Sequence, residues 1–336
     1  MSRIAVIGAG SWGTALAISL ARRTGHSLTL WAHSPSHAHD IAASRTNARY
    51  LPGFPVPEAI RVTSSLTDAV ADANTILCVT PSQALRATLT QMLPALQPHQ
   101  VLLSASKGVE ENTYLRVSEI FAEIAPANPV GTLGGPSFAQ EVAAGLPTAI
   151  TIATHDAALG ESLQNDFTSH SLRVYRNDDI PGTELGGALK NVIALAAGVV
   201  TGLQLSDQPL GNNATAALIT RGIAEMTRLA IACGGQRETM AGLSGVGDLV
   251  LTCTGGLSRN RTVGVELGKG RKLPDIIAAL NGKVAEGVRT TTAALGLARR
   301  HHVEMPITEQ MHAVLHEDKS PLAAIHDLMT RPGRTE

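Results

Sequence analysis

Three glycines near the N-terminus have a spacing that is typical of dinucleotide binding. Gly8, Gly10 and Gly13 form a GxGxxG pattern between an apolar run at residues 4–7 and an amphipathic segment at residues 11–22. In a strand–turn–helix unit, the first glycine allows a tight turn, the second lets the backbone approach a pyrophosphate, and the third lets helix and strand pack closely. The start of the helix supplies N–H groups and a favourable dipole. A glycine-rich turn without a ligand is the alternative, but this position in the chain favours a dinucleotide site.

The end of the second expected strand bears on the choice of cofactor. An acidic side chain there usually holds the adenine ribose, and residues 30–34 contain neither Asp nor Glu. Because no carboxylate would repel a 2′-phosphate, His33, with Arg45 or Arg49, is a candidate contact for that phosphate. A solvated loop residue is the alternative for His33. The sequence favours NADPH/NADP or dual use and leaves NADH/NAD open.

The same region holds several residue types that bind metals. His33, His37, His39 and Asp40 are close together in the sequence. Pro35 is expected to break any helix that would align them, and no second group of ligands is evident. We therefore expect a solvated loop here and no metal site.

Two loops are expected beyond the carboxyl ends of strands, where ligands bind on open α/β sheets. Residues 104–108 carry Lys107 after a strand expected at 101–105, and residues 134–139 follow the next strand. Two ordinary loops with a solvated lysine are the alternative. Because both loops should open onto the crevice that holds the cofactor, we favour contact with a ligand.

Lys190 is the one cation in residues 184–197, which otherwise have an apolar, helical pattern. Its neighbours at helical spacing are small, namely Gly186, Gly187, Ala194 and Ala197. This bare face would let a cofactor or substrate lie beside the ammonium group. Burying an unpaired lysine is costly or forces its deprotonation, and a lowered pKa suits general acid–base chemistry at a carbonyl. A structural ion pair with Glu184 or Asp248 is the alternative.

Further polar groups occur at two expected helix starts. Asp248 precedes Thr252 by one turn and could simply complement the dipole of its helix. The second start has a cap and guanidinium groups, in the run Ser258, Arg259, Asn260 and Arg261. These groups suit a phosphate by charge and by bidentate hydrogen bonding. A capped, solvated turn is the alternative.

The elements that must position these residues change along the chain. Short β-branched runs predict strands at residues 4–7, 28–31, 75–80, 101–105, 130–133, 149–153 and 172–175, with loops at Pro35 and residues 52–57. Beyond Pro181, apolar periodicity predicts helices at residues 183–201, 214–233, 247–253, 274–280, 290–301, 308–316 and 321–330. The predicted fold is an α/β Rossmann domain (doubly wound, mostly parallel sheet) at residues 1–180, followed by an all-α domain at residues 181–336.

Composition limits the kinds of partner. The 336 residues carry a net charge of −1 and 3% aromatic residues, which argues against nucleic acid as a partner. The three cysteines, Cys78, Cys233 and Cys253, form no CxxC pair, which fits a reducing compartment. The N-terminus has no signal-peptide pattern, and the longest apolar run, at residues 192–200, is shorter than the roughly 20 residues of a membrane span. We expect a cytoplasmic protein without a membrane span that acts on a small molecule.

Taken together, these motifs make the chain resemble bacterial NAD(P)-dependent glycerol-3-phosphate dehydrogenase over essentially its whole length. The resemblance rests on motifs at residues 8–17 (GAGSWGTALA), 105–108 (ASKG), 134–139 (GGPSFA), 184–198 (ELGGALKNVIALAAG), 216–222 (AALITRG), 242–254 (GLSGVGDLVLTCT), 258–261 (SRNR), 284–287 (VAEG) and 304–308 (EMPIT). It implies a Rossmann domain followed by an all-helical domain, in agreement with the predicted elements.

The resemblance also implies roles for individual residues. Lys190 would be the proton acceptor, oriented by Asp248, with Asn191 and Thr252 beside it. Besides the glycines of the turn, cofactor contacts are implied at Ser11, Trp12, His33, Tyr50, Lys107, Ala139, Arg259, Val284 and Glu286. Substrate contacts are implied at Lys107, Gly135, Ser137, Lys190, Asp248, Ser258, Arg259 and Asn260.

The implied reaction is reversible hydride transfer between NAD(P)H and dihydroxyacetone phosphate, which gives sn-glycerol 3-phosphate, a precursor for glycerophospholipid synthesis. A homodimer is compatible with the sequence. One departure from the family is a stretch at residues 201–211 that looks longer than usual, with Thr215 where many members carry a basic residue.

Two other functions are kept as alternatives. One is a Rossmann-plus-helical dehydrogenase that acts on a β-hydroxy acid or a sugar acid phosphate, and it would ignore dihydroxyacetone phosphate. The other is a non-catalytic dinucleotide sensor, which would bind NAD(P)H without turnover.

Overall fold

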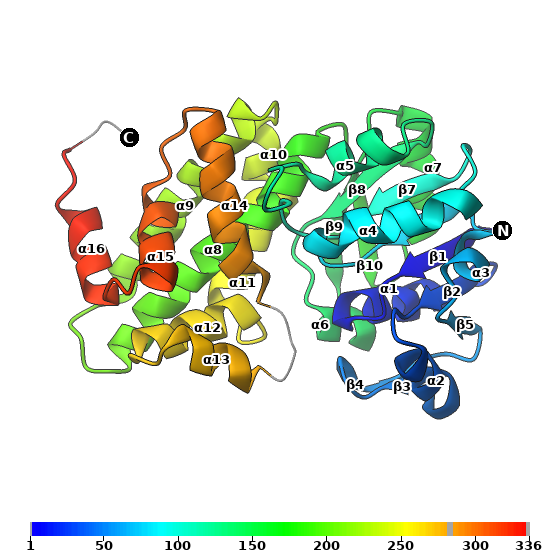
Figure 1. The fold of residues 1–336 in the computed structure, drawn as a ribbon, viewed down its shortest axis with the longest axis horizontal. Coiled ribbons are helices and arrows are strands. Elements are labelled where there is room, and N and C mark those ends of the chain that lie inside the picture. The colour runs from blue at the N-terminus through cyan, green and yellow to red at the C-terminus, as the bar shows by residue number, and fades with distance from the viewer. Residues whose placement is uncertain (1, 281–284, 334–336) are drawn as a thin grey trace. The chain divides into compact units, whose positions relative to one another are not determined.

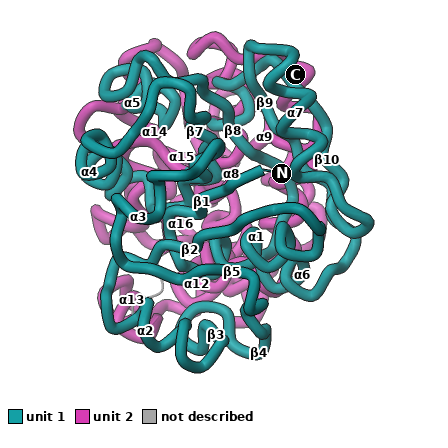
Figure 2. Tube along the Cα trace, turned by 90° about the vertical axis from the view of Figure 1, so that its right-hand side faces the viewer, with its two compact units in different colours: residues 1–107, 115–184 teal, residues 108–114, 185–336 magenta. Residues whose placement is uncertain are grey.

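The computed structural model describes residues 2–280 and 285–333 of the chain. The chain forms two compact units, which Figure 2 colours separately. Unit 1 comprises Met1–Lys107 and Leu115–Glu184, and unit 2 comprises Gly108–Tyr114 and Leu185–Glu336. The domain boundary predicted at residue 180 falls where helix α8 (Ile180–Gln204) begins, and the two units divide within this helix.

Unit 1 is built on an eight-stranded sheet in the order β10-β9-β8-β7-β6-β1-β2-β5. Its strands are β1 (Arg3–Ile7), β2 (Ser27–Trp31), β5 (Ile60–Thr63), β6 (Thr75–Cys78), β7 (Val101–Ser104), β8 (Val130–Gly134), β9 (Thr148–Ala153) and β10 (Leu172–Asn177). Neighbouring strands run parallel except for the antiparallel pair β8–β9. The sheet is therefore mostly parallel, as the alternation of strand and helix patterns predicts.

Helices pack on both faces of this sheet (Figure 1). They are α1 (Ser11–Ala21), α2 (Pro35–Ser44), α3 (Leu66–Val70), α4 (Ser82–Met92), the 3₁₀ turn η1 (Leu93–Ala95), α5 (Val117–Ile124), α6 (Ala139–Ala144) and α7 (Ala157–Phe167). Successive strand residues point to opposite faces. In β1, Ile4 and Val6 join an apolar cluster with α1, α2 and α7, whereas Ala5 and Ile7 join another with α3, α4 and α5. The predicted doubly wound fold is confirmed.

The order of the strands reverses at β1. From β1 the chain adds β2 and β5 on one side of the sheet and then continues with β6 on the other side. Open α/β sheets bind ligands beyond the carboxyl ends of their strands at such a reversal. The glycine-rich turn directly follows β1 and therefore lies at this position.

The prediction that Pro35 breaks a helix is wrong. Pro35 is the first residue of α2, where the missing N–H is no loss and the fixed φ of proline suits the helix. The Ser34 side chain caps this helix by accepting a hydrogen bond from the His37 N–H at 3.4 Å.

The loop predicted at residues 52–57 contains a short strand. Strand β4 (Leu51–Pro55) pairs with β3 (Thr46–Asn47) in a separate two-stranded antiparallel sheet. A two-stranded sheet has only edge strands, and edge strands tolerate proline because a free N–H is not needed on their open side. Proline signals therefore concealed this strand from sequence reasoning.

The regular elements in the described part of unit 2 are all helical. They are α8 (Ile180–Gln204), α9 (Asn212–Ala232), α10 (Arg237–Ala241), the π-helical turn η2 (Leu243–Gly247), α11 (Asp248–Thr254), α12 (Arg259–Gly268), α13 (Leu273–Ala279), α14 (Glu286–Arg300), α15 (Pro306–His316) and α16 (Pro321–Met329). Buried residues from Leu185 to Leu203 make α8 the centre of the hydrophobic core of this unit. The predicted all-α second part is confirmed.

Helix α8 is longer than its apolar run at residues 192–200 indicates. By length and composition it could cross a membrane, but 94% of its most apolar 18-residue window is buried within the fold. Such burial is what a core helix shows. The stretch at residues 201–211, which looks longer than usual in the sequence, includes the last turn of α8, so that the connection to α9 comprises residues 205–211.

Helices α8 and α12 meet at four glycines. Gly198 and Gly202 of α8 face Gly264 and Gly268 of α12 in the same order, so the helices run parallel at this contact. A Cβ at Gly264 would lie 2.0 Å from the Leu195 carbonyl oxygen and 2.9 Å from Gly198 Cα. Any larger residue would push the helices apart, so the glycines set how closely α12 approaches the helix that carries Lys190.

Candidate active site

The glycine-rich turn has the geometry that a dinucleotide site requires. Gly8 has a φ of +128°, and a Cβ there would lie 2.8 Å from the Val79 carbonyl oxygen. A Cβ at Gly13 would lie 1.9 Å from the Gly8 carbonyl oxygen, so the start of α1 can pack on the turn only with glycine at this position. At Gly10, in contrast, nothing lies within 4 Å of the Cβ position among the described residues. This open space beside the backbone fits the approach of a pyrophosphate.

The first turn of α1 presents polar groups next to this space. Gly10 is the N-cap residue and supplies no capping side chain, which leaves the first N–H groups of the helix for a ligand. The Ser11 hydroxyl donates to the Tyr50 carbonyl oxygen at 2.5 Å. Trp12 Nε1 is buried and has no hydrogen-bond partner within residues 2–280 and 285–333. Because an unpaired buried donor is costly, this N–H fits a site that a ligand completes.

Asn47 holds the turn in place, and sequence reasoning missed it. The side chain is fully buried, and its Nδ2 donates to the Ala9 carbonyl oxygen at 3.0 Å and to Thr14 Oγ1 at 2.8 Å. Its Oδ1 accepts a hydrogen bond from the Tyr50 N–H at 3.2 Å. Asn47 therefore ties the turn and α1 to the segment that carries Tyr50. No local pattern marks it, because its partners in the turn lie 38 and 33 positions away.

The Asn47→Ala variant is expected to bind NAD(P)H about 3- to 10-fold more weakly than the wild type. Its free energy of unfolding should be about 1–3 kcal/mol lower. The substitution leaves the Ala9 carbonyl and the Thr14 hydroxyl without their donor. Fluorescence titration with NADH measures the affinity, and unfolding in urea measures the stability. Asn128→Ala is a matched control, because Asn128 Nδ2 also donates two hydrogen bonds, both at 2.8 Å, to backbone carbonyls elsewhere in unit 1. Unchanged affinity in Asn47→Ala would contradict this role.

The end of β2 presents the residues predicted to select the cofactor. His33 is exposed, and its ring meets the Trp31 ring edge-on at 5.9 Å. The Arg45 guanidinium donates to three backbone carbonyls, at 3.2 and 3.1 Å to two of them and also to that of Pro57. Arg45 therefore stabilises the following segment rather than presenting its charge freely. Arg49 is exposed and lies over the Tyr50 ring at 5.1 Å. His33 and Arg49 thus remain the accessible candidates for a 2′-phosphate.

The solvated loop predicted at residues 33–40 is largely helical: His33 precedes helix α2, and His37 and His39 lie within it. His37 is partly buried, with its Nε2 3.4 Å from the Ala9 carbonyl oxygen and its ring edge-on to Tyr50 at 5.2 Å. His39 and Asp40 are exposed. In the part of the chain that the structure describes, no group of three or more His, Cys, Asp or Glu residues could hold a metal ion.

Four further predicted contacts of unit 1 lie after β7 and β8. Lys107 is half-buried in the segment that follows β7. Gly135 directly follows β8 with a φ of +109°, and a Cβ there would lie 3.2 Å from Ile150 Cα. The Ser137 hydroxyl donates to the Gly135 carbonyl oxygen at 3.1 Å, and Ala139 begins α6. The carboxyl ends of the parallel strands β7 and β8 therefore position these residues.

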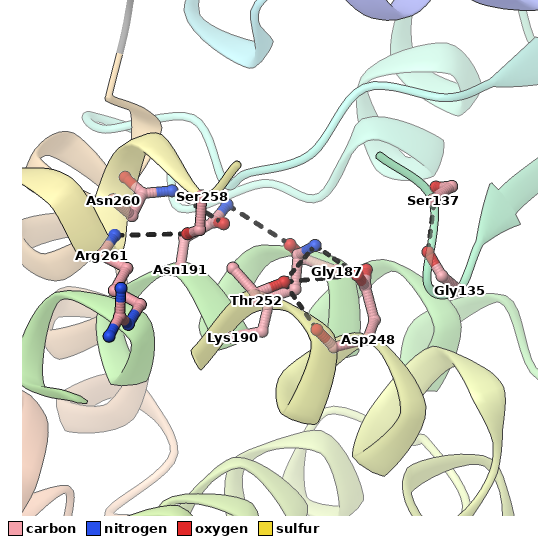
Figure 3. Close-up of polar contacts among 10 residues, drawn as sticks. All are labelled: Gly135, Ser137, Gly187, Lys190, Asn191, Asp248, Thr252, Ser258, Asn260 and Arg261. Atoms are coloured by element: carbon pink, nitrogen blue, oxygen red, sulfur yellow. Dashed lines mark hydrogen bonds and ion pairs between the residues drawn. The ribbon is translucent and has the colours of Figure 1, made fainter. Parts of the chain in front are cut away.

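In unit 2, Lys190 is buried against two partners (Figure 3). Its Nζ forms an ion pair with Asp248 and donates a hydrogen bond to Thr252 Oγ1 at 3.0 Å. The Thr252 hydroxyl in turn donates to the Asp248 main-chain carbonyl at 2.6 Å, one helical turn back in α11. Helices α8 and α11 thus bring together three side chains that are distant in the sequence, and the ammonium group is held at a defined position.

Glu184, the other partner considered for Lys190, is paired elsewhere. It lies in unit 1 and accepts hydrogen bonds from the Arg116 guanidinium at 2.8 Å and from the Ser118 N–H and hydroxyl, both at 2.7 Å. Burial raises the pKa of Glu184, and Arg116 opposes this rise. Asp248 is therefore the acidic partner of Lys190, and Glu184 fixes the start of α8.

The bare helix face beside Lys190 is partly used for packing. A Cβ at Gly186 would lie 2.2 Å from the Ser244 carbonyl oxygen, so Gly186 lets the π-helical turn η2 lie against α8. The Gly186 part of the face is therefore used for packing, and a ligand beside the ammonium group stays a prediction. Asp248 directly follows η2 in the chain. The close packing of η2 on α8 therefore also fixes the position of Asp248 along α8, beside Lys190.

Cys253 is a buried neighbour of this cluster. Burial raises the pKa of its thiol to about 12, although the positive charges of Lys190 and Arg261 oppose the rise. The thiol therefore stays neutral at physiological pH. A neutral thiol is a weak nucleophile, which leaves the amine as the reactive group of this cluster.

A chain of amide hydrogen bonds connects Asn191 to the starts of two helices. Asn260 Nδ2 donates to Asn191 Oδ1 at 2.9 Å, and Asn260 Oδ1 accepts from the Gly287 N–H at 3.0 Å. A Cβ at Gly287 would lie 2.7 Å from the Asn191 carbonyl oxygen, so only glycine fits there. Glu286, a predicted cofactor contact, is thereby held near this network as the first residue of α14. Val284, another predicted contact, lies outside the described residues.

The start of α12 has the capped form that the sequence predicts. Ser258 is the N-cap residue and accepts a hydrogen bond from the Arg261 N–H at 3.2 Å. Arg259 is exposed, whereas Asn260 is buried. The Nε of Arg261 is buried and finds no hydrogen-bond partner within the described ranges. An exposed guanidinium at a helix N-terminus can bind a phosphate, and of the two arginines Arg259 is the exposed one.

The structure groups the predicted residues into two sets. In unit 1 the glycine-rich turn, Ser11, Trp12 and Tyr50 lie together, and the segments after β7 and β8 carry the other contacts. In unit 2, Lys190, Asp248 and Thr252 form one cluster, and Asn191, Asn260 and Gly287 form the next. The assignment of individual residues to cofactor or substrate stays a prediction.

Comparisons with known proteins agree with this arrangement. Two family models match the chain: the N-terminus of NAD-dependent glycerol-3-phosphate dehydrogenase over residues 3–160, and its C-terminus over residues 179–326. A glycerol-3-phosphate dehydrogenase (NAD(P)+) from Koribacter versatilis is 58% identical over 339 residues, covering 100% of this chain and 99% of the relative. One from Acidobacterium capsulatum is 58% identical, with 100% of both chains covered.

Solved structures extend the comparison. The crystal structure of glycerol-3-phosphate dehydrogenase from Coxiella burnetii is 41% identical, has a TM-score of 0.93, and covers 98% of this chain and 99% of that one. A PanE/ApbA family ketopantoate reductase from Ralstonia eutropha shares the fold with a TM-score of 0.62, at 17% identity, over 96% of this chain and 100% of that one. Because the family models and the relatives match this sequence almost from end to end, the chain belongs to the NAD-dependent glycerol-3-phosphate dehydrogenase family.

Proposed function

We propose that this chain catalyses the reversible reduction of dihydroxyacetone phosphate to sn-glycerol 3-phosphate with NADH or NADPH. The observation that carries the proposal is the buried Lys190 amine, held by Asp248 and Thr252, in a chain whose relatives are named glycerol-3-phosphate dehydrogenase. The dinucleotide would supply the hydride. The open space at Gly10 and the unpaired Trp12 Nε1 support its binding at the glycine-rich turn.

Lys190 would act as the general acid in the reductive direction. Its ammonium group would donate a hydrogen bond, and then a proton, to the C2 oxygen as negative charge develops there. Because the amine is buried, this interaction would be stronger than the same contact in water. In the oxidative direction the neutral amine would take the proton from the C2 hydroxyl.

Asp248 and Thr252 would act on the amine rather than on the substrate. The Asp248 carboxylate balances the charge of Lys190 in a buried site, and the Thr252 oxygen fixes the direction of a second N–H bond. A lysine ammonium group has three N–H donors. Lys190 is proposed to direct one of them to the substrate oxygen during the reaction.

Recognition of the phosphate would use the start of α12. Ser258, Arg259 and Asn260 are proposed to hold it, since a helix N-terminus and an exposed guanidinium both favour an anion. Lys107, Gly135 and Ser137 are the proposed substrate contacts of unit 1. Binding energy from the phosphate would position the reacting carbon, which is how a remote group contributes to the rate.

The decisive experiment follows the oxidation of NADH and of NADPH at 340 nm with dihydroxyacetone phosphate as acceptor. We expect turnover with at least one of the two cofactors and formation of sn-glycerol 3-phosphate. Turnover only with a β-hydroxy acid or a sugar acid phosphate would assign the chain to another dehydrogenase activity. Binding of NAD(P)H without any turnover would favour a sensor.

Arg259→Ala is expected to raise KM for dihydroxyacetone phosphate by about 10-fold or more while kcat changes less, because a charge-assisted contact to phosphate is lost. Steady-state kinetics with dihydroxyacetone phosphate and with dihydroxyacetone separate the two effects. Arg299→Ala serves as the control, since Arg299 is an exposed arginine at the other end of α14 from Glu286. An equal loss with the phosphate-free ketone would refute the role in phosphate binding.

We further propose that the product serves glycerophospholipid synthesis in the cytoplasm and that residues 1–180 and 181–336 are the two domains. Cys78, Cys233 and Cys253 form no disulfide bond in the described structure, which is usual in a reducing compartment. A homodimer is the proposed assembly. Size-exclusion chromatography with light scattering tests the homodimer, and fractionation of cells tests the cytoplasmic location.

A further inference from the structure

Thr80 has a buried hydroxyl group with no use in the structure described so far. The residue is 6% exposed, and its Oγ1 has no hydrogen-bond partner among residues 2–280 and 285–333. Its carbonyl oxygen, in contrast, accepts a hydrogen bond from the Ser106 hydroxyl at 2.6 Å. Leaving a buried hydroxyl unpaired is unfavourable, and an isosteric valine would avoid the cost. The hydroxyl is therefore a candidate contact for a bound ligand, and its place in the fold decides whether a ligand can reach it.

The position of Thr80 indicates which partner this is. Thr80 follows β6, which is the neighbour of β1 on the side where the strand order reverses. The Val79 carbonyl oxygen and the Thr80 backbone nitrogen would lie 2.8 and 3.2 Å from a Cβ at Gly8. The backbone of Thr80 thus packs directly against the first glycine of the dinucleotide turn. Residues at this reversal face the crevice in which such sheets bind a dinucleotide.

The strands on the two sides of the reversal are expected to bind different halves of the dinucleotide. In a doubly wound sheet, each half of the fold binds one mononucleotide, and the pyrophosphate lies at the first glycine-rich turn. Strand β2, with His33 after it, belongs to the half expected to hold the adenosine. Strand β6, with Thr80 after it, begins the other half, so Thr80 is placed toward the nicotinamide end.

We propose that the Thr80 hydroxyl forms a hydrogen bond with the ribose-phosphate on the nicotinamide side of bound NAD(P)H. This inference rests on the proposed function, because it requires the same cofactor at the same turn. A threonine hydroxyl can both donate and accept, and this part of the cofactor offers hydroxyl groups and phosphate oxygens. The contact would satisfy the unpaired oxygen only when the cofactor is bound.

The test is the Thr80→Val variant, which keeps the shape of the side chain and removes the hydroxyl. Fluorescence titration with NADH and NADPH, and competition by ADP-ribose and 5′-AMP, give the dissociation constants. We expect Kd for NADH, NADPH and ADP-ribose to rise about 3- to 10-fold, the value of one hydrogen bond, with Kd for 5′-AMP unchanged. The melting temperature of the cofactor-free variant should equal or exceed that of the wild type, because no hydrogen bond of the free protein is lost.

Thr168→Val is the matched control. Thr168 Oγ1 is also buried and unpaired among the described residues. However, the Thr168 carbonyl accepts a hydrogen bond from Arg23, which follows the C-terminal end of α1, whereas the glycine-rich turn precedes the N-terminal end of α1. This variant should bind all four nucleotides like the wild type.

Any outcome other than the expected one contradicts a specific step of the inference. An unchanged Kd for NADH in Thr80→Val overturns the contact and leaves the proposed function intact. A lower melting temperature of the cofactor-free variant assigns the hydroxyl to the fold instead. An equal rise in Kd for 5′-AMP contradicts the nicotinamide side, and a wild-type chain that binds neither NADH nor NADPH overturns the proposed function together with this contact.

Discussion

The Lys190→Ala enzyme is expected to reduce dihydroxyacetone phosphate with a kcat about 10²–10⁴-fold below that of the wild type, the usual value of a positioned acid–base group. Affinity for NAD(P)H should change little, because the proposed cofactor turn lies in unit 1 and Lys190 lies in unit 2. Stopped-flow reduction at saturating substrate, with a parallel NADH titration, measures both quantities. The loss should appear in kcat, since the contact to the C2 oxygen strengthens as charge develops there.

Removal of the amine also disturbs a buried ion pair, which requires a second variant. Lys190→Ala leaves the fully buried Asp248 without its counter-charge, which costs about 3–5 kcal/mol of stability. The double variant Lys190→Met/Asp248→Asn removes both charges and should recover much of that stability while remaining inactive. Lys269→Ala removes an exposed lysine that pairs with Glu266 at 3.0 Å and should leave kcat unchanged. Near-normal turnover in Lys190→Ala would exclude Lys190 from the mechanism.

Gly264→Ala is expected to lower the free energy of unfolding by about 3 kcal/mol and to raise KM for dihydroxyacetone phosphate. The added methyl would lie 2.0 Å from the Leu195 carbonyl oxygen, so α12 has to move away from α8. Because Asn260 precedes Gly264 by one turn, the movement would lengthen its 2.9 Å hydrogen bond to Asn191. Urea unfolding and steady-state kinetics measure the two effects.

Gly256→Ala provides the comparison for this substitution. No heavy atom lies within 4 Å of the Cβ position at Gly256 in the described structure, although this glycine also lies close to the start of α12. Its stability and KM should stay close to those of the wild type. If Gly264→Ala unfolds like the wild type, the close contact of α8 and α12 does not set the position of the phosphate-binding residues.

Several features were predictable because they depend on residues that are close in the sequence. The glycine-rich turn is a pattern of six residues between a strand and a helix, and the structure gives its three glycines distinct positions. The doubly wound sheet follows from the alternation of strand and helix patterns. Lys190 was recognisable as the single cation in an apolar helix, because burial of a charge demands a partner or a ligand.

Misleading local signals account for most of the errors. Pro35 was interpreted as a helix breaker, although at a first helical position it favours the helix. The prolines in residues 52–57 concealed β4. In each case the residue type allows two structures, and the neighbours in space decide between them.

What the sequence determined by itself was therefore the type of fold, the dinucleotide turn and the identity of the buried amine. The tertiary structure decided which partners these groups have: Asp248 rather than Glu184 for Lys190, Asn47 for the turn, and Asn260 for Asn191 and Gly287. The physical reason is that periodicity and turn chemistry act over a few residues. The buried hydrogen bonds in these examples join residues 27 to 69 positions apart, and only the packing of the whole unit brings their two ends together.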